Sequence, residues 1–295
     1  MHVVYWEEKA MGDIKHIVFP VDFSDRCLGA VPFVQGMASR YGAKVTLIHV
    51  VHPFYPGGLE GPAIIDPEEL LRDARSRLYA SMANQFPEVK VESVIQIGDP
   101  ATFIADFAKT NNVDLVMMPS HGYGPFRQLL LGSVTAKVLH DVQCPVWTSA
   151  HSGEAPGREH LAVRKILCAV DTNPQSVTTM QWAAVMAKDT GASLRLVHVV
   201  PAVEAWPERQ MDQEFQEQMR ITARKEIEDL ERSAGINVPV CVTMGTVPDA
   251  VRREALQHGT DLLVIGRGVL QETLGRLRTH AYGIIRHSPC PVLSV

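Results

Sequence analysis

Short, continuous apolar runs rich in Val, Ile and Leu alternate along this chain with longer segments whose apolar residues recur at helical spacing. Continuous apolar runs are typical of strands that are covered on both faces, as in a parallel sheet flanked by helices. The runs predict strands near residues 15–21, 44–50, 90–97, 114–119, 145–149, 165–170, 193–199, 238–244, 261–265 and 291–295. The pattern therefore predicts an α/β protein.

The same order of elements occurs twice. The run that ends at Asp22 has a counterpart that ends at Asp171, 149 residues later, and the Cys-Pro-Val motif at Cys144 returns at Cys290, 146 residues later. A repeat of this length is a duplicated domain and not a solenoid unit. We expect two tandem doubly wound domains of the Rossmann-like class, each a five-stranded parallel sheet flanked by four helices.

Segments that fit neither pattern set the predicted boundaries. Residues 1–13 form an N-terminal arm, 14–150 the first domain, 151–163 a linker of mixed Gly, Pro, Ser and Glu, and 164–295 the second domain.

Residue types at the helix ends agree with this division. Ser24 and Asn173 are candidate N-caps of the first helix in each domain, and Gly42 and Gly191 are candidate glycines at the ends of those helices.

The amino-acid composition mainly excludes certain classes of partner and of cysteine chemistry. A hydrophobic fraction of 46% with 21% charged residues fits a soluble globular protein, and a net charge of -5 without a long basic run gives no reason to expect a nucleic-acid or membrane partner. Because no secretory h-region or membrane-spanning stretch occurs, we expect a cytoplasmic protein. The 5 cysteines form no CxxC pair. They indicate neither zinc nor disulfides, and we expect most of them to be inert core thiols.

Candidate chemistry gathers after the first-domain strands, at the edge where an open α/β sheet binds ligands. Asp22 follows the first strand, Pro119-Ser-His-Gly122 follows the fourth, and Gly132-Ser133 opens the next helical segment after nine residues. Glycine lets the backbone approach a phosphate, and the amides of a helix N-terminus hold the anion. His121 could contact a phosphate oxygen, and Asp22 could accept hydrogen bonds from a ribose. These residues indicate a nucleotide-binding site.

This set of residues resembles the universal stress proteins, here as a tandem of two domains. The ATP-binding subgroup of that family carries Gly-x-x-Gly, nine residues, then Gly-Ser/Thr, with an aspartate closing the first strand and a Cys/Lys-Pro-Val ending. The first copy departs at Pro119, which replaces a glycine and removes an amide donor. The resemblance implies an adenine nucleotide alpha hydrolase-like fold and ATP as the ligand, with Mg²⁺ considered as its companion. It places the ATP contacts on Val21, Asp22, Val50, Met118, His121, Gly122, Gly132, Ser133 and Val134.

The second copy departs further from the motif. Gly266 and Gly268 are one residue too close together, and Arg278-Thr279 replaces the Gly-Ser pair. The arginine could occupy the phosphate position, or its guanidinium could pair with a phosphate in a changed pose. Asp171 and Val199 are retained. We expect a degenerate nucleotide site in the second domain.

Structural alternatives stay open for several of these residues. Asp22 and Asp171 could simply cap the helices that follow them. His49 and His198, at equivalent ends of the second strands, are expected to be structural. Because the sequence has no nucleophile elbow, no Walker A motif and no metal-ligand spacing, we expect no catalytic residues and no metal site, and any ATP hydrolysis would be slow and incidental.

Three functions remain open. The leading one is a stress-response regulator whose ATP-bound first domain changes its association with an unidentified protein partner. The second is a nucleotide-free interaction scaffold, and the third is an ATP-using hydrolase or transferase. Apolar edge strands need covering. We therefore expect the strands 145–149 and 291–295 to pair as an intrachain pseudo-dimer, which could associate further as a homodimer.

Overall fold

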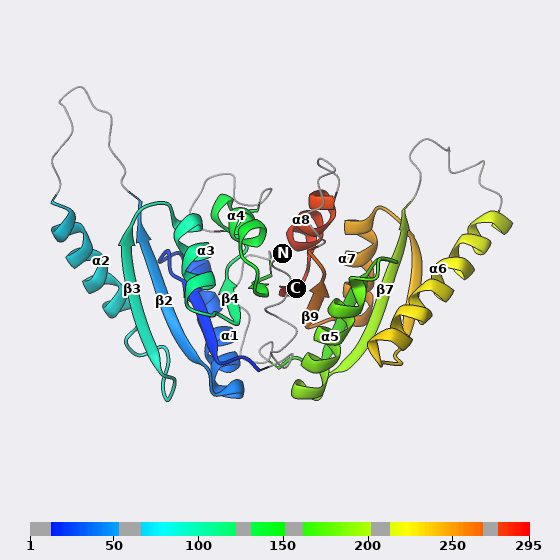
Figure 1. Cartoon of the computed structure of the whole chain (residues 1–295), viewed down its shortest axis with the longest axis horizontal. Coiled ribbons are helices and arrows are strands. Elements are labelled where there is room, and N and C mark those ends of the chain that lie inside the picture. Colours follow the sequence, from blue (N-terminus) through cyan, green and yellow to red (C-terminus); the bar gives the residue numbers. More distant parts are fainter. Residues whose placement is uncertain (1–12, 53–65, 122–130, 151–161, 202–212, 268–276) are drawn as a thin grey trace, which may run out of the picture. The chain divides into compact units, whose positions relative to one another are not determined.

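The structure is a computed structural model that describes residues 13–52, 66–121, 131–150, 162–201, 213–267 and 277–295. The chain forms two compact units, one containing residues 13–147 and the other containing residues 162–295. Figure 1 colours the first unit from blue to green and the second from green to red. Each unit has its own sheet and its own helices.

The first domain has its strands in the order β3-β2-β1-β4-β5. The pairs β1–β2, β1–β4 and β2–β3 are parallel. Its elements are β1 His16–Pro20, α1 Asp25–Tyr41, β2 Lys44–Val51, α2 Pro67–Met82, β3 Val91–Ile97, α3 Pro100–Thr110, β4 Leu115–Met118, α4 Ser133–Asp141 and β5 Val146–Thr148.

The second domain repeats this arrangement, with β8-β7-β6-β9-β10 in the corresponding order. The pairs β6–β7, β6–β9, β7–β8 and β9–β10 are parallel. Its elements are β6 Lys165–Val170, α5 Ser176–Thr190, β7 Ser193–Pro201, α6 Gln213–Ala234, β8 Val240–Gly245, α7 Val247–His258, β9 Leu262–Ile265, α8 Leu277–His287 and β10 Val292–Ser294.

Strand order explains the continuous apolar runs. The chain moves outward from β1 to β3 and then crosses back to β4, so right-handed crossovers place α1 and α2 on one face of the sheet and α3 and α4 on the other. Within the domains α3 packs against α4, α5 against α6, and α7 against α8. Every residue of the inner strands β4 and β9 is buried. The predicted fold class is confirmed.

A buried aspartate fixes the start of β4 against β1. The Oδ2 atom of Asp114 accepts the backbone N–H groups of Lys15 and His16, both at 2.8 Å, and the residue is 4% exposed. Asp261 makes the same pair of bonds, both at 2.9 Å, to the backbone where β6 begins. One carboxylate in each domain therefore satisfies two main-chain donors at the edge opposite the candidate site.

Helix ends follow the predicted signals in three of four cases. Ser24 caps α1 by accepting the N–H of Cys27, and Gly42 and Gly191 end α1 and α5 in the left-handed conformation, with φ of 61° and 71°. This conformation suits glycine because it has no Cβ.

The prediction for Asn173 is wrong. The N-cap of α5 is Gln175, and the helix begins at Ser176. Residues 174–175 form a turn before the helix, so Asn173 stands too early to cap it. Its side-chain amide instead donates to Asp171 at 2.7 Å.

The cysteines behave as core residues. All five are free, and only Cys241 is not fully buried. Burial, reinforced by the nearby charge of Asp22, raises the pKa of the Cys27 thiol to about 12. Burial also raises the pKa of Cys290 to about 11. Such thiols stay protonated at neutral pH and are poor nucleophiles, as predicted.

Candidate functional site

The predicted residues of the first domain come from elements that end at one edge of its sheet. Val21 and Asp22 follow β1, Val50 is near the end of β2, and Met118 ends β4. Because these strands are parallel neighbours, their carboxyl ends lie together. The remaining predicted contacts follow β4 or begin α4; of these, Gly122 lies outside the described residues.

Gly132 forms the phosphate end of this candidate site. It is the N-cap of α4, and no side chain caps the helix there. Its N–H donates to the carbonyl of Ser120 at 3.0 Å, and a Cβ on Gly132 would lie 3.1 Å from the Cα of His121. Ser133 is exposed at the first helical position. The helix start is therefore held close to the segment after β4, with first-turn amides that suit an anion.

Pro119 and His121 lie next to the first turn of α4. The carbonyl of Pro119 accepts the hydroxyl of Thr135 at 3.1 Å, so the proline contributes to fixing α4 although it offers no amide to a ligand. His121 is 3% exposed, and its Nδ1 lies 3.1 Å from the hydroxyl of Ser120. In this conformation His121 presents little surface to a phosphate.

Asp22 is half-buried and has a structural role. Its Oδ1 accepts the backbone N–H of Ser24 at 2.9 Å and the Ser24 hydroxyl at 2.6 Å. Asp22 therefore orients the residue that caps α1 and is not the cap itself.

The Asp171 carboxylate accepts more hydrogen bonds than that of Asp22. Its Oδ1 accepts the Asn173 N–H at 3.0 Å and the Ser176 hydroxyl at 2.7 Å, and its Oδ2 accepts the side chain of Asn173. Both carboxylate oxygens of Asp171 are already engaged, so this residue is less suited to a ribose than Asp22 is.

The two strand-end histidines are structural, as expected. The Nδ1 atom of His49 bonds the carbonyl of Val21 at 2.7 Å, and that of His198 bonds the carbonyl of Val170 at 2.9 Å. A carbonyl can only accept, so Nδ1 carries the proton in both rings. The N–H of Val21 is also engaged, with the carbonyl of Ile48 at 2.8 Å. Val21 therefore offers a ligand mainly its side chain.

An aromatic stack fills the space beside His49 in the first domain. The ring of Phe23 lies 4.5 Å from that of His49, and the guanidinium of Arg77, on α2, lies 4.3 Å over the Phe23 ring. Phe23 is 8% exposed and has a φ of 62°, a conformation that bulky residues rarely adopt.

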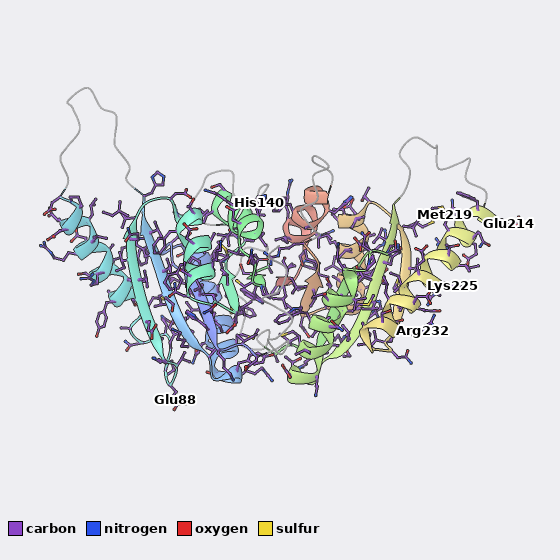
Figure 2. All side chains as sticks on the ribbon, in the orientation of Figure 1. Glu88, His140, Glu214, Met219, Lys225 and Arg232 are labelled. Atoms are coloured by element: carbon purple, nitrogen blue, oxygen red, sulfur yellow. The ribbon has the colours of Figure 1, made fainter. Side chains whose placement is uncertain are left out.

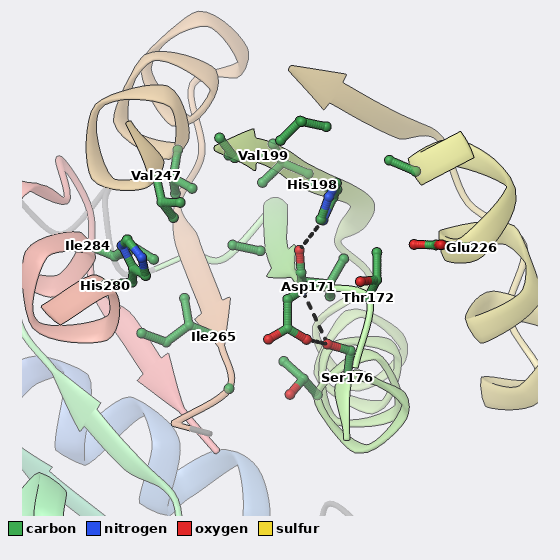
Figure 3. Close-up of a pocket in the computed structure, with 18 of the residues that line it drawn as sticks. Asp171, Thr172, Ser176, His198, Val199, Glu226, Val247, Ile265, His280 and Ile284 are labelled. Carbon is green, nitrogen blue, oxygen red and sulfur yellow. Dashed lines mark hydrogen bonds between the residues drawn. The ribbon is translucent and has the colours of Figure 1, made fainter. Parts of the chain in front are cut away.

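In the second domain the corresponding region is open. A cavity of about 840 Å³ lies at the carboxyl ends of β6, β7 and β9, with α5, α6, α7 and α8 around it. Figure 3 shows Val247, Ile265 and Ile284 on one side and Glu226 on the other. Asp171 lies between them. From the sequence we predicted a degenerate nucleotide site here and missed the cavity.

A helical pattern on α6 could have indicated it. Phe215, Met219, Thr222 and Glu226 follow one another at spacings of four, three and four residues, and all four line the cavity. The exposed side of α6 carries charged side chains such as that of Lys225 (Figure 2).

No group of three or more His, Cys, Asp or Glu residues is placed to hold a metal ion within the described ranges. None of the helices in those ranges is long and apolar enough to cross a membrane.

The fold and the site edge define the class of protein: two tandem doubly wound α/β domains of the adenine nucleotide alpha hydrolase-like fold. The model of the universal stress protein family matches residues 13–149 and 162–295. The chain belongs to the universal stress protein family.

Individual relatives agree with this assignment. A universal stress protein of Methanocaldococcus jannaschii is 33% identical over 136 residues, which are 45% of this chain and 79% of that protein. One of Mycolicibacterium smegmatis is 29% identical over 145 residues, 49% of each, so the chain matches about half the length of that relative. The crystal structure of a universal stress protein from Archaeoglobus fulgidus, 20% identical, shares the fold over 95% of both chains with a TM-score of 0.65.

Proposed function

We propose that this chain is a cytoplasmic, nucleotide-dependent regulator of the stress response that binds one ATP, accompanied by Mg²⁺, in its first domain. ATP would bind at the carboxyl edge of the first sheet, with its phosphates at the start of α4 and its ribose near Asp22. The second domain lacks the Gly-Ser pair of the motif and contributes no equivalent phosphate site.

The observation that carries the proposal is the environment of Gly132. This residue is an N-cap without a side chain, it lies against the backbone of His121, and it starts a helix of 9 residues whose first side chain is the exposed Ser133. A phosphate can approach such a helix start closely, and the helix dipole favours its charge.

Regulation would follow from linkage between ligand and partner. ATP that binds one state of the first domain stabilises that state, and a partner protein that recognises the same state would then bind more tightly. The proposal includes no catalysis. The Ser120 hydroxyl lies beside the His121 ring, but Ser120 is 0% exposed and so cannot attack a bound substrate.

The aspartates allow a matched test of the ATP site. We expect Asp22→Asn to weaken the binding of Mg-ATP about tenfold, because a hydrogen bond from ribose to a carboxylate is stronger than one to an amide. Asparagine keeps an oxygen acceptor for Ser24, so the cap of α1 should persist. Isothermal titration calorimetry on the full chain measures the effect.

Asp171→Asn is the control, since Asp171 occupies the equivalent position in the second domain. It should leave ATP affinity unchanged. Equal weakening by both substitutions would contradict a first-domain site. An absence of binding to the wild-type chain at millimolar ATP would remove the proposal altogether.

In that last case the interaction scaffold becomes the better account. Two observations favour it: Pro119 offers no amide, and His121 is buried in the described conformation. A scaffold would still bind its partner protein, but the binding would not depend on nucleotide.

A further inference from the structure

The second-domain cavity and the corresponding region of the first domain differ in the residues at two wall positions. Thr172 stands 149 residues after Phe23, and Glu226 stands 149 residues after Arg77. Phe23 and Arg77 form the aromatic stack beside His49 in the first domain. Thr172 is small and Glu226 carries the opposite charge to arginine, and both line the cavity of the second domain.

Burial supports this correspondence along the helices. Ala74 on α2 and Ala223 on α6 are also 149 residues apart, and they are 8% and 7% exposed. Leu78 and Ile227 have the same separation and are 1% and 0% exposed. The two helices therefore turn the same positions toward their sheets, and position 226 faces the space that Arg77 faces in the first domain.

The polar groups of the cavity favour a cationic ligand on one side. Asp171 ends β6, and Glu226 extends from α6 toward the cavity in Figure 3. His280 lies on the other side, on α8, and Arg267 follows β9. A ligand with a cationic end near the two carboxylates would be stabilised, whereas a phosphate chain there would be repelled.

The remaining wall is apolar. Val247, Ile265 and Ile284 are on the side away from Glu226, and Phe215 and Met219 line the cavity from the first turns of α6. Phe215 is 52% exposed, an unusual position for a large aromatic residue that lines a cavity. An aromatic ligand could cover it, and Phe215 can also attract a cation through its ring face.

We propose that the cavity of the second domain binds a small aromatic cation, with its ring system against the apolar wall and its charge near Glu226 and Asp171. A volume of about 840 Å³ suits a molecule of this kind. The inference does not depend on ATP binding in the first domain. It assigns the two copies ligands of opposite charge.

Proflavine, a planar fluorescent cation, is a suitable probe, and anilinonaphthalene sulfonate is its anionic counterpart. In fluorescence titrations of the full chain we expect saturable binding of one proflavine and much weaker binding of the anion. Glu226→Gln should weaken proflavine binding about threefold to tenfold, because the carboxylate is partly exposed to water. Glu228→Gln, on the exposed side of the same helix, is the matched control and should have no effect.

A second variant tests whether the ligand occupies the cavity, independently of the cavity's charge. Thr222→Phe places a ring in the cavity from a position where the native side chain is exposed to solvent, so the fold should tolerate it. Proflavine binding should fall about tenfold or more. Gly36→Arg, within α1 of the first domain, where a Cβ would meet no atom within 4 Å, should leave proflavine binding unchanged.

Weaker proflavine binding to both Glu226→Gln and Thr222→Phe, with both controls unaffected, would support the proposal. Failure of the wild-type chain to bind proflavine would overturn it. So would equal affinity for the anionic dye, or proflavine binding that neither cavity variant alters.

Discussion

We expect the replacement of Gly132 by arginine to abolish the proposed binding of ATP to the first domain. Arginine stands at the corresponding motif position in the second copy, at Arg278. A Cβ on Gly132 would already lie 3.1 Å from the Cα of His121, and the long side chain would extend over the start of α4 where phosphate is expected. We expect affinity to fall at least about 100-fold, or about 3 kcal/mol. Calorimetric titration with Mg-ATP measures this loss.

Gly36→Arg provides the control for this substitution. Gly36 lies within α1, and a Cβ there would meet no atom within 4 Å, so the same change of residue has room. This variant should bind ATP as the wild type does. Retention of ATP affinity in Gly132→Arg would show that the start of α4 is not the phosphate site.

Removing the Asp114 carboxylate has the largest expected effect on stability. Asp114→Ala leaves the N–H groups of Lys15 and His16 without their acceptor at a position that is 4% exposed. We expect the first domain to lose about 2–4 kcal/mol of its free energy of unfolding. Amide hydrogen exchange, resolved by peptide, should show faster exchange in β1 and β4 and unchanged exchange in the second domain.

Asp261→Ala is the comparison, because Asp261 makes the same two bonds but is only half-buried. Water can replace its carboxylate more easily, so the second domain should lose about 1 kcal/mol. An equal or larger loss from Asp261→Ala would contradict the argument from burial.

The fold could be predicted because the inner strands, such as β4 and β9, are covered on both faces. A residue such as Val116 in β4 or Val264 in β9 is 0% exposed, and covered strands need an unbroken apolar run. Because the domain is duplicated, the same order of strands and helices could be predicted twice from independent parts of the sequence. Helix ends were predictable where one residue decides them, as Ser24 does, and not where a turn intervenes, as at Asn173.

Only part of the candidate site could be predicted from the sequence. Residues that follow a strand are placed by the strand, so Asp22 could be assigned to the ligand edge. The burial of His121 could not, because it depends on how α4 packs over the preceding segment. The second-domain cavity depends on Thr172 and Glu226, two residues far apart in sequence that lie outside the nucleotide motif.

Native mass spectrometry of the full chain with Mg-ATP is the most direct test of the central claim. One adenine nucleotide per chain is expected for the wild type and for Gly36→Arg, and none for Gly132→Arg. A wild-type chain that carries no nucleotide, or that carries two, would contradict a single ATP site in the first domain.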